Sequence, residues 1–180
     1  MKLIKTQLDG LLIIEPDVYQ DERGYFFESY NQEKFRNLGM DVTFVQDNES
    51  KSMKGVLRGL HFQVPPFGQG KLVRVMQGAV FDVAVDLRKK SPTYGKWECV
   101  ELSEKNKRMY WIPEGFAHGF LTLENDTVFF YKCTAVYNKE SEKSIAWNDP
   151  DLNIQWGLTD PVLSERDKTC PGFKNFISPF

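Results

Sequence analysis

The sequence predicts an all-β fold, a β-sandwich or β-barrel, and two observations support this prediction. About ten short apolar segments are separated by turn-forming residues, and almost none of the chain has the period of a helix. Aromatic residues make up 14% of the 180 residues, a composition that favours β structure with a large packed interior. A chain of this length can bury one core, so we expect residues 1–180 to form a single domain.

The predicted elements follow one another at short intervals from the N-terminus. Leu11–Glu15 is the first strand, and the turn Asp21–Gly24 leads into a second strand, Tyr25–Tyr30. A short helix follows, with Asn31 as its N-cap and Gly39 as its stop signal. The remaining predicted strands are Val42–Gln46, Val56–Gln63, Lys71–Gln77, Ala79–Leu87, Trp97–Leu102, Met109–Ile112, Ala117–Leu123 and Val128–Tyr137.

The alternation within Ala79–Leu87 indicates how one strand divides its two faces. Its large apolar side chains share one face, which we expect to meet a packed core, while Asp82 and Asp86 share the other. The second face is polar enough to line a wet cavity or the protein surface. Because a small barrel can hold one ligand inside, a polar inner wall is a reasonable expectation.

Composition and charge argue against several classes of protein. Lys plus Arg (23) nearly cancels Asp plus Glu (25), which argues against disorder and against a broad basic face for nucleic acid. No apolar run approaches the ~20 residues of a membrane span, and no signal peptide is evident, so we expect a cytoplasmic protein. The three cysteines, Cys99, Cys133 and Cys170, are too widely spaced for a C-x-x-C pair and are interpreted as free thiols.

The chain has only two histidines, so candidates for acid–base chemistry are few. His61 follows Arg58 by three residues, which combines a titratable base with a guanidinium suited to anions. Strict strand alternation would separate these two side chains onto opposite faces. They share a pocket only if Gly59 permits a bulge or if the long Arg58 side chain bends around. A structural or surface histidine is the alternative interpretation.

Two further segments carry candidate residues. Lys71 begins a strand after a glycine-containing loop, and His118 lies among small residues that leave room beside its ring. A solvated lysine and a structural histidine remain the alternatives. Metal-binding barrels of this size usually need a His-x-His pair, a carboxylate and a third histidine, so we expect no metal here. No Gly-x-Ser-x-Gly, Rossmann or P-loop signature is present.

Eight segments, in order, match the pattern of one known family. They are Asp21–Glu28, Phe44–Ser50, Gly55–Gln63, Gln69–Val73, Phe81–Arg88, Ile112–Phe120, Trp147–Pro150 and Leu163–Asp167. Together they resemble the dTDP-4-dehydrorhamnose 3,5-epimerase family, and they cover nearly the whole chain up to Asp167. The segment Lys168–Phe180 carries no part of the resemblance.

The resemblance implies an isomerase of dTDP-L-rhamnose biosynthesis with a cupin-like jelly-roll barrel and few short helices. It implies no metal and no other cofactor, and a homodimer whose N-terminal strands cross to the partner. The substrate would be a dTDP-linked 4-keto-6-deoxyhexose, dTDP-4-dehydro-6-deoxy-D-glucose. Its C3 and C5 protons are acidic because both carbons flank the C4 ketone, and the product would be dTDP-4-dehydro-L-rhamnose.

The resemblance also implies four catalytic residues. His61 would be the general base and Asp167 its partner, while Lys71 would stabilise the enolate oxygen and bind substrate. Tyr131 would return a proton to the opposite face of the sugar ring, since a neutral phenol is a donor at pH 7. The other residues implied to bind substrate are Arg23, Glu28, Gln46, Asp47, Asn48, Arg58, His118, Glu142 and Arg166.

Within this set, the two arginines Arg23 and Arg58 would hold the pyrophosphate. His118, oriented by Asp82, would lie near the C4 oxygen.

Three alternatives to a double epimerase remain at this stage. A relative that epimerises only C3, in another dTDP-4-keto-6-deoxysugar pathway, would use the same residues. A non-catalytic sugar-binding barrel would have no reason to keep a base, a lysine and a tyrosine acid together. A metal-dependent cupin dioxygenase is the third alternative.

Overall fold

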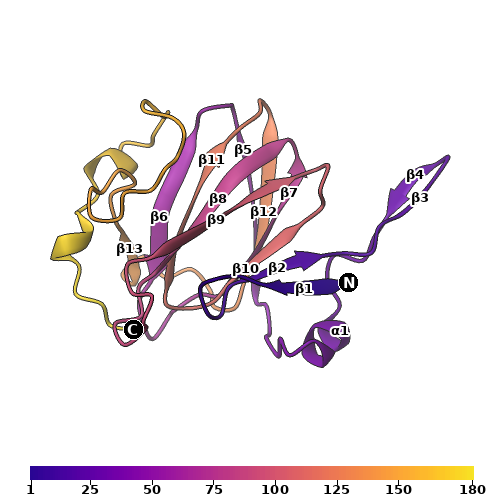
Figure 1. Ribbon diagram of the computed structural model, residues 1–180, viewed down its shortest axis with the longest axis horizontal. Coiled ribbons are helices and arrows are strands. Elements are labelled where there is room, and N and C mark those ends of the chain that lie inside the picture. Colours follow the sequence, from indigo (N-terminus) through magenta and orange to yellow (C-terminus); the bar gives the residue numbers. More distant parts are fainter.

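Two antiparallel sheets form the body of the protein in the computed structural model, which describes all residues from Met1 to Phe180 (Figure 1). In spatial order, the six-stranded sheet consists of β1 (Lys2–Lys5), β2 (Leu12–Glu15), β10 (Met109–Ile112), β7 (Lys71–Gln77), β12 (Thr127–Cys133) and β5 (Gln46–Ser52). The five-stranded sheet consists of β13 (Glu142–Ser144), β6 (Leu57–Gln63), β11 (Phe116–Thr122), β8 (Ala79–Asp86) and β9 (Trp97–Ser103). The arrangement is a cupin-like jelly roll, and the predicted all-β class is confirmed.

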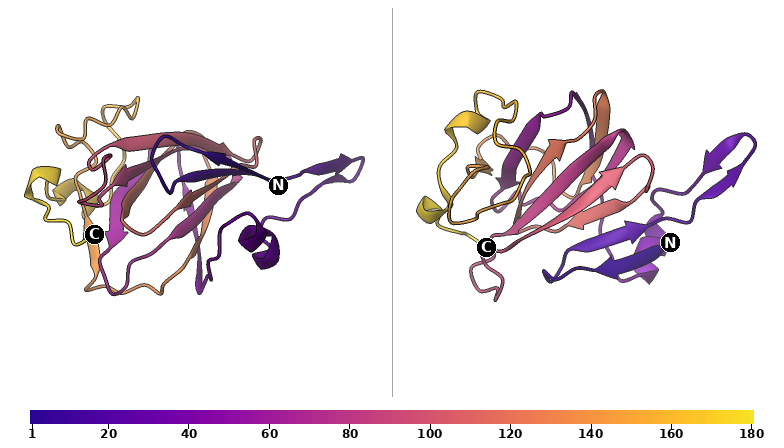
Figure 2. Two further views of the ribbon diagram at one scale, coloured as in Figure 1. Left: turned by 60° about the horizontal axis from the view of Figure 1, so that its bottom comes forward. Right: turned by 45° about the horizontal axis from the view of Figure 1, so that its top comes forward.

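The remaining elements lie at the two ends of the molecule. A hairpin of β3 (Tyr19–Asp21) and β4 (Gly24–Phe26) projects away from the sheets, and α1 (Gln32–Asn37) lies near its base (Figures 1 and 2). At the opposite end, the C-terminal segment contains two short 3₁₀ turns, η1 (Asp167–Thr169) and η2 (Phe173–Asn175). No helix is long and apolar enough to span a membrane.

The predicted helix is confirmed, together with its cap. The Asn31 side chain accepts a hydrogen bond from the backbone N–H of Lys34 at 3.1 Å, which satisfies one free donor at the start of α1. The buried face of the helix consists of Phe35 alone, and this ring packs with Tyr30 at a centroid distance of 5.0 Å. The helix therefore covers the outer face of the six-stranded sheet.

Several predicted strand boundaries were wrong. Residues 42–45 form no strand; instead β5 begins at Gln46 and runs through seven polar residues to Ser52. Apolar periodicity cannot reveal this strand, because alternate side chains face the interior and solvent and none of them is apolar. The strand predicted at Tyr25–Tyr30 ends at Phe26, and the short strands β1, β3 and β13 were not predicted.

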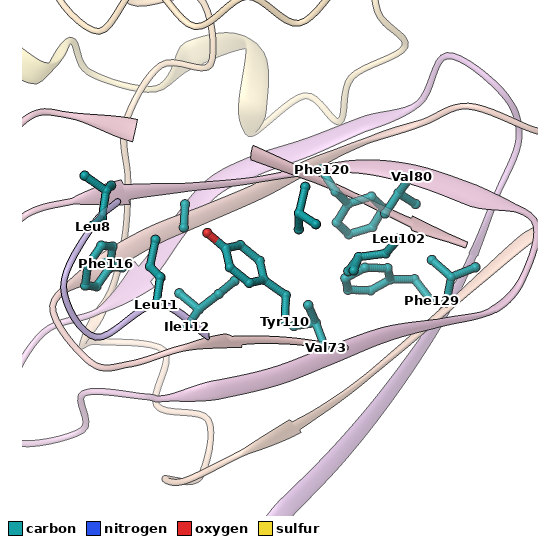
Figure 3. Close-up of a cluster of buried hydrophobic side chains, with 13 residues drawn as sticks. Leu8, Leu11, Val73, Val80, Leu102, Tyr110, Ile112, Phe116, Phe120 and Phe129 are labelled. Carbon is teal, nitrogen blue, oxygen red and sulfur yellow. The ribbon is translucent and has the colours of Figure 1, made fainter. Parts of the chain in front are cut away.

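The main core lies between the two sheets (Figure 3). Both sheets contribute large side chains to it: Tyr110 and Phe129 come from the six-stranded sheet, and Phe120 comes from the five-stranded sheet. The rings of Phe120 and Phe129 stack at a centroid distance of 4.1 Å. This aromatic packing fills one part of the interior and leaves another part free for polar side chains.

Strand β8 shows that both faces of a strand can be buried here. The predicted apolar face is confirmed, since Val83, Val85 and Leu87 are fully buried under the C-terminal segment. The opposite face is also inaccessible, with Asp82 and Asp86 both 0% exposed. Asp82 therefore lies inside the barrel and not on the surface.

A β-bulge in β6 brings Arg58 and His61 to the same side of the sheet. His118 of β11 pairs with His61 and Phe120 pairs with Arg58, so two steps along β11 match three steps along β6. Gly59 makes this possible, because its φ of +146° suits glycine and an added Cβ would lie 2.6 Å from Gly119 Cα. The expectation of a bulge at Gly59 is confirmed.

We expect Gly59→Ala to destabilise the protein by about 3 kcal/mol or more, because it combines an unfavourable φ with a backbone collision. Gly157→Ala is the matched control, since Gly157 has a φ of +74° but no atom within 4 Å of an added Cβ. The control should cost only about 1–2 kcal/mol. Urea unfolding measures both values, and equal losses in the two variants would contradict the close approach of the strands.

Candidate active site

A cavity of about 480 Å³ lies beside the aromatic core, between the two sheets and the C-terminal segment. Its polar wall comes from elements far apart in the sequence: β6, β7, β11, β12 and the residues that lead into η1. The predicted site residues that line it are Arg58, His61, Lys71, His118, Tyr131, Arg166 and Asp167.

His61 and Asp167 form a close pair in the wall of this cavity. The distance from His61 Nε2 to Asp167 Oδ1 is 2.6 Å, and the aspartate side chain is 3% exposed. Because a carboxylate accepts the hydrogen, Nε2 is the protonated ring nitrogen and Nδ1 keeps a lone pair. The pair thus holds the imidazole in a tautomer that can accept a proton.

Burial alone would raise the pKa of Asp167, but other contacts reverse this effect. Hydrogen bonds from His61 and Ser164, and the charges of His61 and Arg166, favour the carboxylate and leave its pKa below the ordinary value. The Asp167 backbone N–H also donates to Ser164 Oγ at 3.1 Å, which fixes the start of η1. Asp167 is therefore an ionised partner of His61 at neutral pH.

Lys71 lies in the same wall and forms no ion pair. Burial lowers the pKa of its ammonium group, while the nearby Cys133, Asp82 and Glu142 act in the opposite direction. A cation that is already desolvated and unpaired is available to a negative charge that develops on a bound molecule.

His118 and Asp82 form a second, deeper pair. The Nε2 atom of His118 is 3.0 Å from both carboxylate oxygens of Asp82, which is completely buried. Burial lowers the pKa of His118 and raises the pKa of Asp82, and the attraction between the two side chains opposes both shifts. The stacked ring of Phe129, at a centroid distance of 6.1 Å, holds the imidazole from one side.

Tyr131 completes the group of side chains with acid–base chemistry. Burial raises the pKa of its phenol, and the charge of Arg58 opposes this shift. The phenol is therefore neutral at pH 7 and can donate a proton. A base, an unpaired cation and a phenol around one cavity can together remove a proton from a carbon atom and return one.

A second cavity of about 300 Å³ adjoins the first and shares His61, Lys71 and Tyr131 with it. Three more predicted residues, Gln46, Asn48 and Glu142, line this extension, so it widens the site toward β5 and β13.

Sequence reasoning missed Tyr137, whose hydroxyl donates to Glu142 Oε2 at 2.9 Å at the rim of this extension. Glu142 also pairs with Arg166 at 2.6 Å and thereby links the two cavities. Tyr137 was placed inside a predicted strand, and its sequence neighbours carry no signal of a site.

Three predicted residues lie outside both cavities. Arg23 is at the tip of the projecting hairpin, where it is paired with Asp21 and its side chain is 85% exposed. Glu28 pairs with Lys34. Asp47 lies on the face of β5 that points away from the barrel interior, and it pairs with Lys132 at 2.8 Å.

The side chains of this site do not assemble a metal-ligand set. No group of three or more His, Cys, Asp or Glu side chains is arranged to hold a metal ion anywhere in the chain.

Comparison with known proteins identifies close relatives. The sequence matches the family described as dTDP-4-dehydrorhamnose 3,5-epimerase over residues 5–175. An enzyme of this name from Salmonella typhimurium is 58% identical over 173 residues, which cover 95% of this chain and 94% of the relative. The Legionella pneumophila dTDP-6-deoxy-D-glucose-3,5-epimerase, crystallised with dTDP-4-keto-L-rhamnose, matches with a TM-score of 0.94 and 52% identity, covering 98% and 94% of the two chains. A 3'-monoepimerase from Streptomyces bikiniensis, crystallised with dTDP-quinovose, matches with a TM-score of 0.88 and 36% identity, covering 93% and 85%.

The jelly-roll fold and these relatives define the protein as an isomerase, a carbohydrate epimerase that acts on a nucleotide-linked sugar. More particularly, the chain belongs to the dTDP-4-dehydrorhamnose 3,5-epimerase family.

Proposed function

We propose that residues 1–180 act as one epimerase domain that converts dTDP-4-dehydro-6-deoxy-D-glucose to dTDP-4-dehydro-L-rhamnose. The observation that supports this most directly is the position of His61, Lys71 and Tyr131 in the walls of both adjoining cavities. The reaction belongs to dTDP-L-rhamnose biosynthesis, and we propose a cytoplasmic location for it.

The chemistry needs only proton transfer. Carbons C3 and C5 of the substrate flank the C4 ketone, so removal of either proton gives an enolate whose charge resides on the C4 oxygen. Return of a proton to the opposite face of the ring inverts that carbon. Two such inversions convert the D-sugar to the L-sugar without an oxidant or reductant.

In this proposal His61 is the general base. Its Nδ1 lone pair takes the proton from carbon, and the Asp167 carboxylate, 2.6 Å from Nε2, stabilises the resulting imidazolium. The imidazolium then loses its proton to solvent, so each inverted carbon carries a hydrogen that comes from water.

Lys71 and His118 act on the C4 oxygen. The unpaired ammonium of Lys71 stabilises the enolate charge, an interaction of the kind worth roughly 10²–10³ in rate. His118, whose Nε2 is held by Asp82, helps to position the same oxygen.

Tyr131 is the acid on the other face of the sugar. It gives its phenolic proton to the carbanion carbon and regains a proton from solvent. The pKa of this phenol is raised by burial, which keeps the hydroxyl protonated until it is needed.

The nucleotide and its diphosphate fit the cationic and amide-rich parts of the cleft. Arg58 and Arg166 offer guanidinium groups to phosphate oxygens, for which their geometry is well suited. Gln46, Asn48 and Glu142 supply polar contacts from the adjoining cavity. Asp47 would act indirectly, through its pairing with Lys132 on the outer face of the sheet.

We propose a homodimer in which the β3–β4 hairpin reaches the partner's cleft. The hairpin exposes large aromatic side chains, with Tyr19, Tyr25 and Phe26 from 56% to 70% exposed, and such a patch is costly to leave in water. Arg23 and Glu28 lie far from their own cavity but on or beside this hairpin. Crossing to a second copy would bring them to a substrate.

The alternative function is epimerisation at C3 alone. Its support is the similarity to the Streptomyces bikiniensis 3'-monoepimerase, which shares the fold. The relatives named as 3,5-epimerases are more similar to this chain, and the complex with dTDP-4-keto-L-rhamnose favours the double epimerase.

Incubation with dTDP-4-keto-6-deoxyglucose in D₂O tests the function. We expect NMR to show deuterium at both C3 and C5 together with the L-sugar, because both new hydrogens come from solvent. Deuterium at C3 alone would support the alternative, and no exchange would contradict both. As the control, His61→Ala should lose turnover by a factor of roughly 10³ or more while still binding dTDP.

Tyr131→Phe should separate exchange from inversion. We expect it to keep deuterium exchange at C3 on the face of His61, while formation of the L-sugar falls by roughly 10²–10⁴. Exchange and product formation are measured in the same NMR time course. An equal loss of both would assign Tyr131 a different role.

The dimer predicts a mass in solution of twice the 20.9 kDa chain. Light scattering measures this mass directly. We also expect Arg23→Ala to raise KM with little change in kcat, because the arginine binds the phosphates and does not touch the reacting carbons. A mass of one chain, with Arg23→Ala kinetics like those of the wild type, would contradict the crossed hairpin.

A further inference from the structure

The C-terminal segment packs against the back of the strand that carries His61. The neighbouring residue Phe62 points to the outer face of β6 and is 3% exposed. Its ring meets Phe176 at a centroid distance of 5.1 Å and Phe180 at 6.3 Å. The segment after Asp167, which carries no catalytic group in the mechanism above, is thus part of the support of β6.

Asp149 fastens this segment to the rest of the protein. The side chain is 4% exposed, and its Oδ1 accepts the backbone N–H groups of Asp151 and Leu152 at 2.9 and 3.0 Å. Its Oδ2 accepts the backbone N–H of Phe173 at 2.8 Å. One buried carboxylate therefore closes a local turn with one oxygen and holds η2 with the other.

A second bond reinforces the same junction. The backbone N–H of Ala146 donates to the carbonyl of Pro171 at 2.9 Å, just before η2 begins. Ile145 in turn exchanges two backbone hydrogen bonds with Leu60 of β6, at 3.0 and 3.2 Å. The C-terminal segment is thus attached to β6 through Ile145 and Ala146, the two residues that precede Trp147.

Asp167 lies between two anchored points of the chain. Upstream, Leu57 N–H donates to the carbonyl of Val162 at 3.0 Å, which attaches that end to β6. Downstream, the next anchors are Pro171 and Phe173, held by Ala146 and Asp149. Between these anchors the Asp167 carboxylate reaches His61 at 2.6 Å and the neighbouring Arg166 pairs with Glu142, so the backbone anchors and this ion pair together set the separation.

We infer that Asp149 is a positioning residue for the His61–Asp167 pair. By holding Phe173 it keeps η1 against β6, and so it keeps the His61 imidazole in one tautomer. The inference rests on the proposed function of His61 as the base. The effect on substrate binding should be smaller, because Asp149 makes no hydrogen bond to Arg58, Gln46 or Asn48 and only Arg166 lies in the stretch that it holds.

The test uses ¹⁵N-labelled histidine in the full-length protein. The chain has only two histidines, and NMR of their ring nitrogens reports the tautomer of each. In the wild type each histidine ring should be held in a single tautomer, His61 by Asp167 and His118 by Asp82. The His118 ring is held by Asp82 of β8 and not by the C-terminal segment, and it therefore serves as a control within the same spectrum.

In Asp149→Ala we expect the His61 signals to move toward a mixture of tautomers while those of His118 stay unchanged. The value of kcat should fall by roughly 10²-fold, the usual cost of a misplaced catalytic group, and the Kd for dTDP should rise by a smaller factor. Asp151→Ala is the matched control, because its exposed side chain makes no hydrogen bond or ion pair and its N–H remains in place. It should have the spectrum and the turnover of the wild type.

A folded Asp149→Ala protein with an unchanged His61 spectrum would overturn the inference. If the His118 signals also change, the variant has lost its fold, and Asp149→Asn then decides the matter. That variant keeps the size of the side chain and one acceptor oxygen, but its amide NH₂ group cannot accept the N–H of Phe173 while the oxygen accepts those of Asp151 and Leu152. It should therefore release His61 alone, and a fixed His61 in a folded Asp149→Asn protein would overturn the inference.

The NMR spectrum of the histidine rings does not depend on turnover. The proposed role of His61 as the base and the proposed role of Asp149 can therefore be tested independently of each other. An active His61→Ala enzyme would remove the proposed base and leave the effect of Asp149 on the ring unaltered.

Discussion

The close contact between β6 and β11 at Gly59 and Gly119 is the constraint on which the site depends. At this point an added Cβ would lie 2.6 Å from the backbone of the opposite strand, so two glycines allow the strands to approach. The resulting bulge shifts the alternation of side chains along β6 by one residue. Arg58 and His61 therefore face the same side of the sheet. Without the bulge, the guanidinium of Arg58 and the imidazole of His61 would lie on opposite faces of one sheet.

The interior of the barrel combines two environments that suit enolate chemistry. The stacked rings of Phe120 and Phe129 exclude water from one part, and beside them His118 and Asp82 are buried and Lys71 is half-buried. Burial shifts the pKa values of these groups toward their neutral forms, and each group has an opposing charge nearby. Such a site stabilises a charge that appears on a substrate oxygen more strongly than water does.

The two ends of the chain serve the central barrel in different ways. The N-terminal hairpin projects from the body and carries exposed aromatic residues, which suits it for contact with another molecule. The C-terminal segment folds back on the barrel and brings Asp167 to His61 across 106 positions of sequence. The barrel supplies His61, Lys71 and Tyr131, and the C-terminal extension adds Asp167 and Arg166 to the same cavity.

The sequence by itself determined the β class, the capped helix at Asn31 and strands β7 and β10, because alternation and turn residues are local signals. Its resemblance to a family also named His61, Lys71, Tyr131 and Asp167 together. Periodicity could not reveal β5, since a strand whose two faces are both polar carries no apolar signal. Only the tertiary structure decided that His61 meets Asp167, that Asp82 is buried against His118, and that Arg23 lies outside its own cavity. These facts depend on the bulge, the packing of two sheets and the course of the chain ends, and such contacts between distant residues leave no mark on the local pattern.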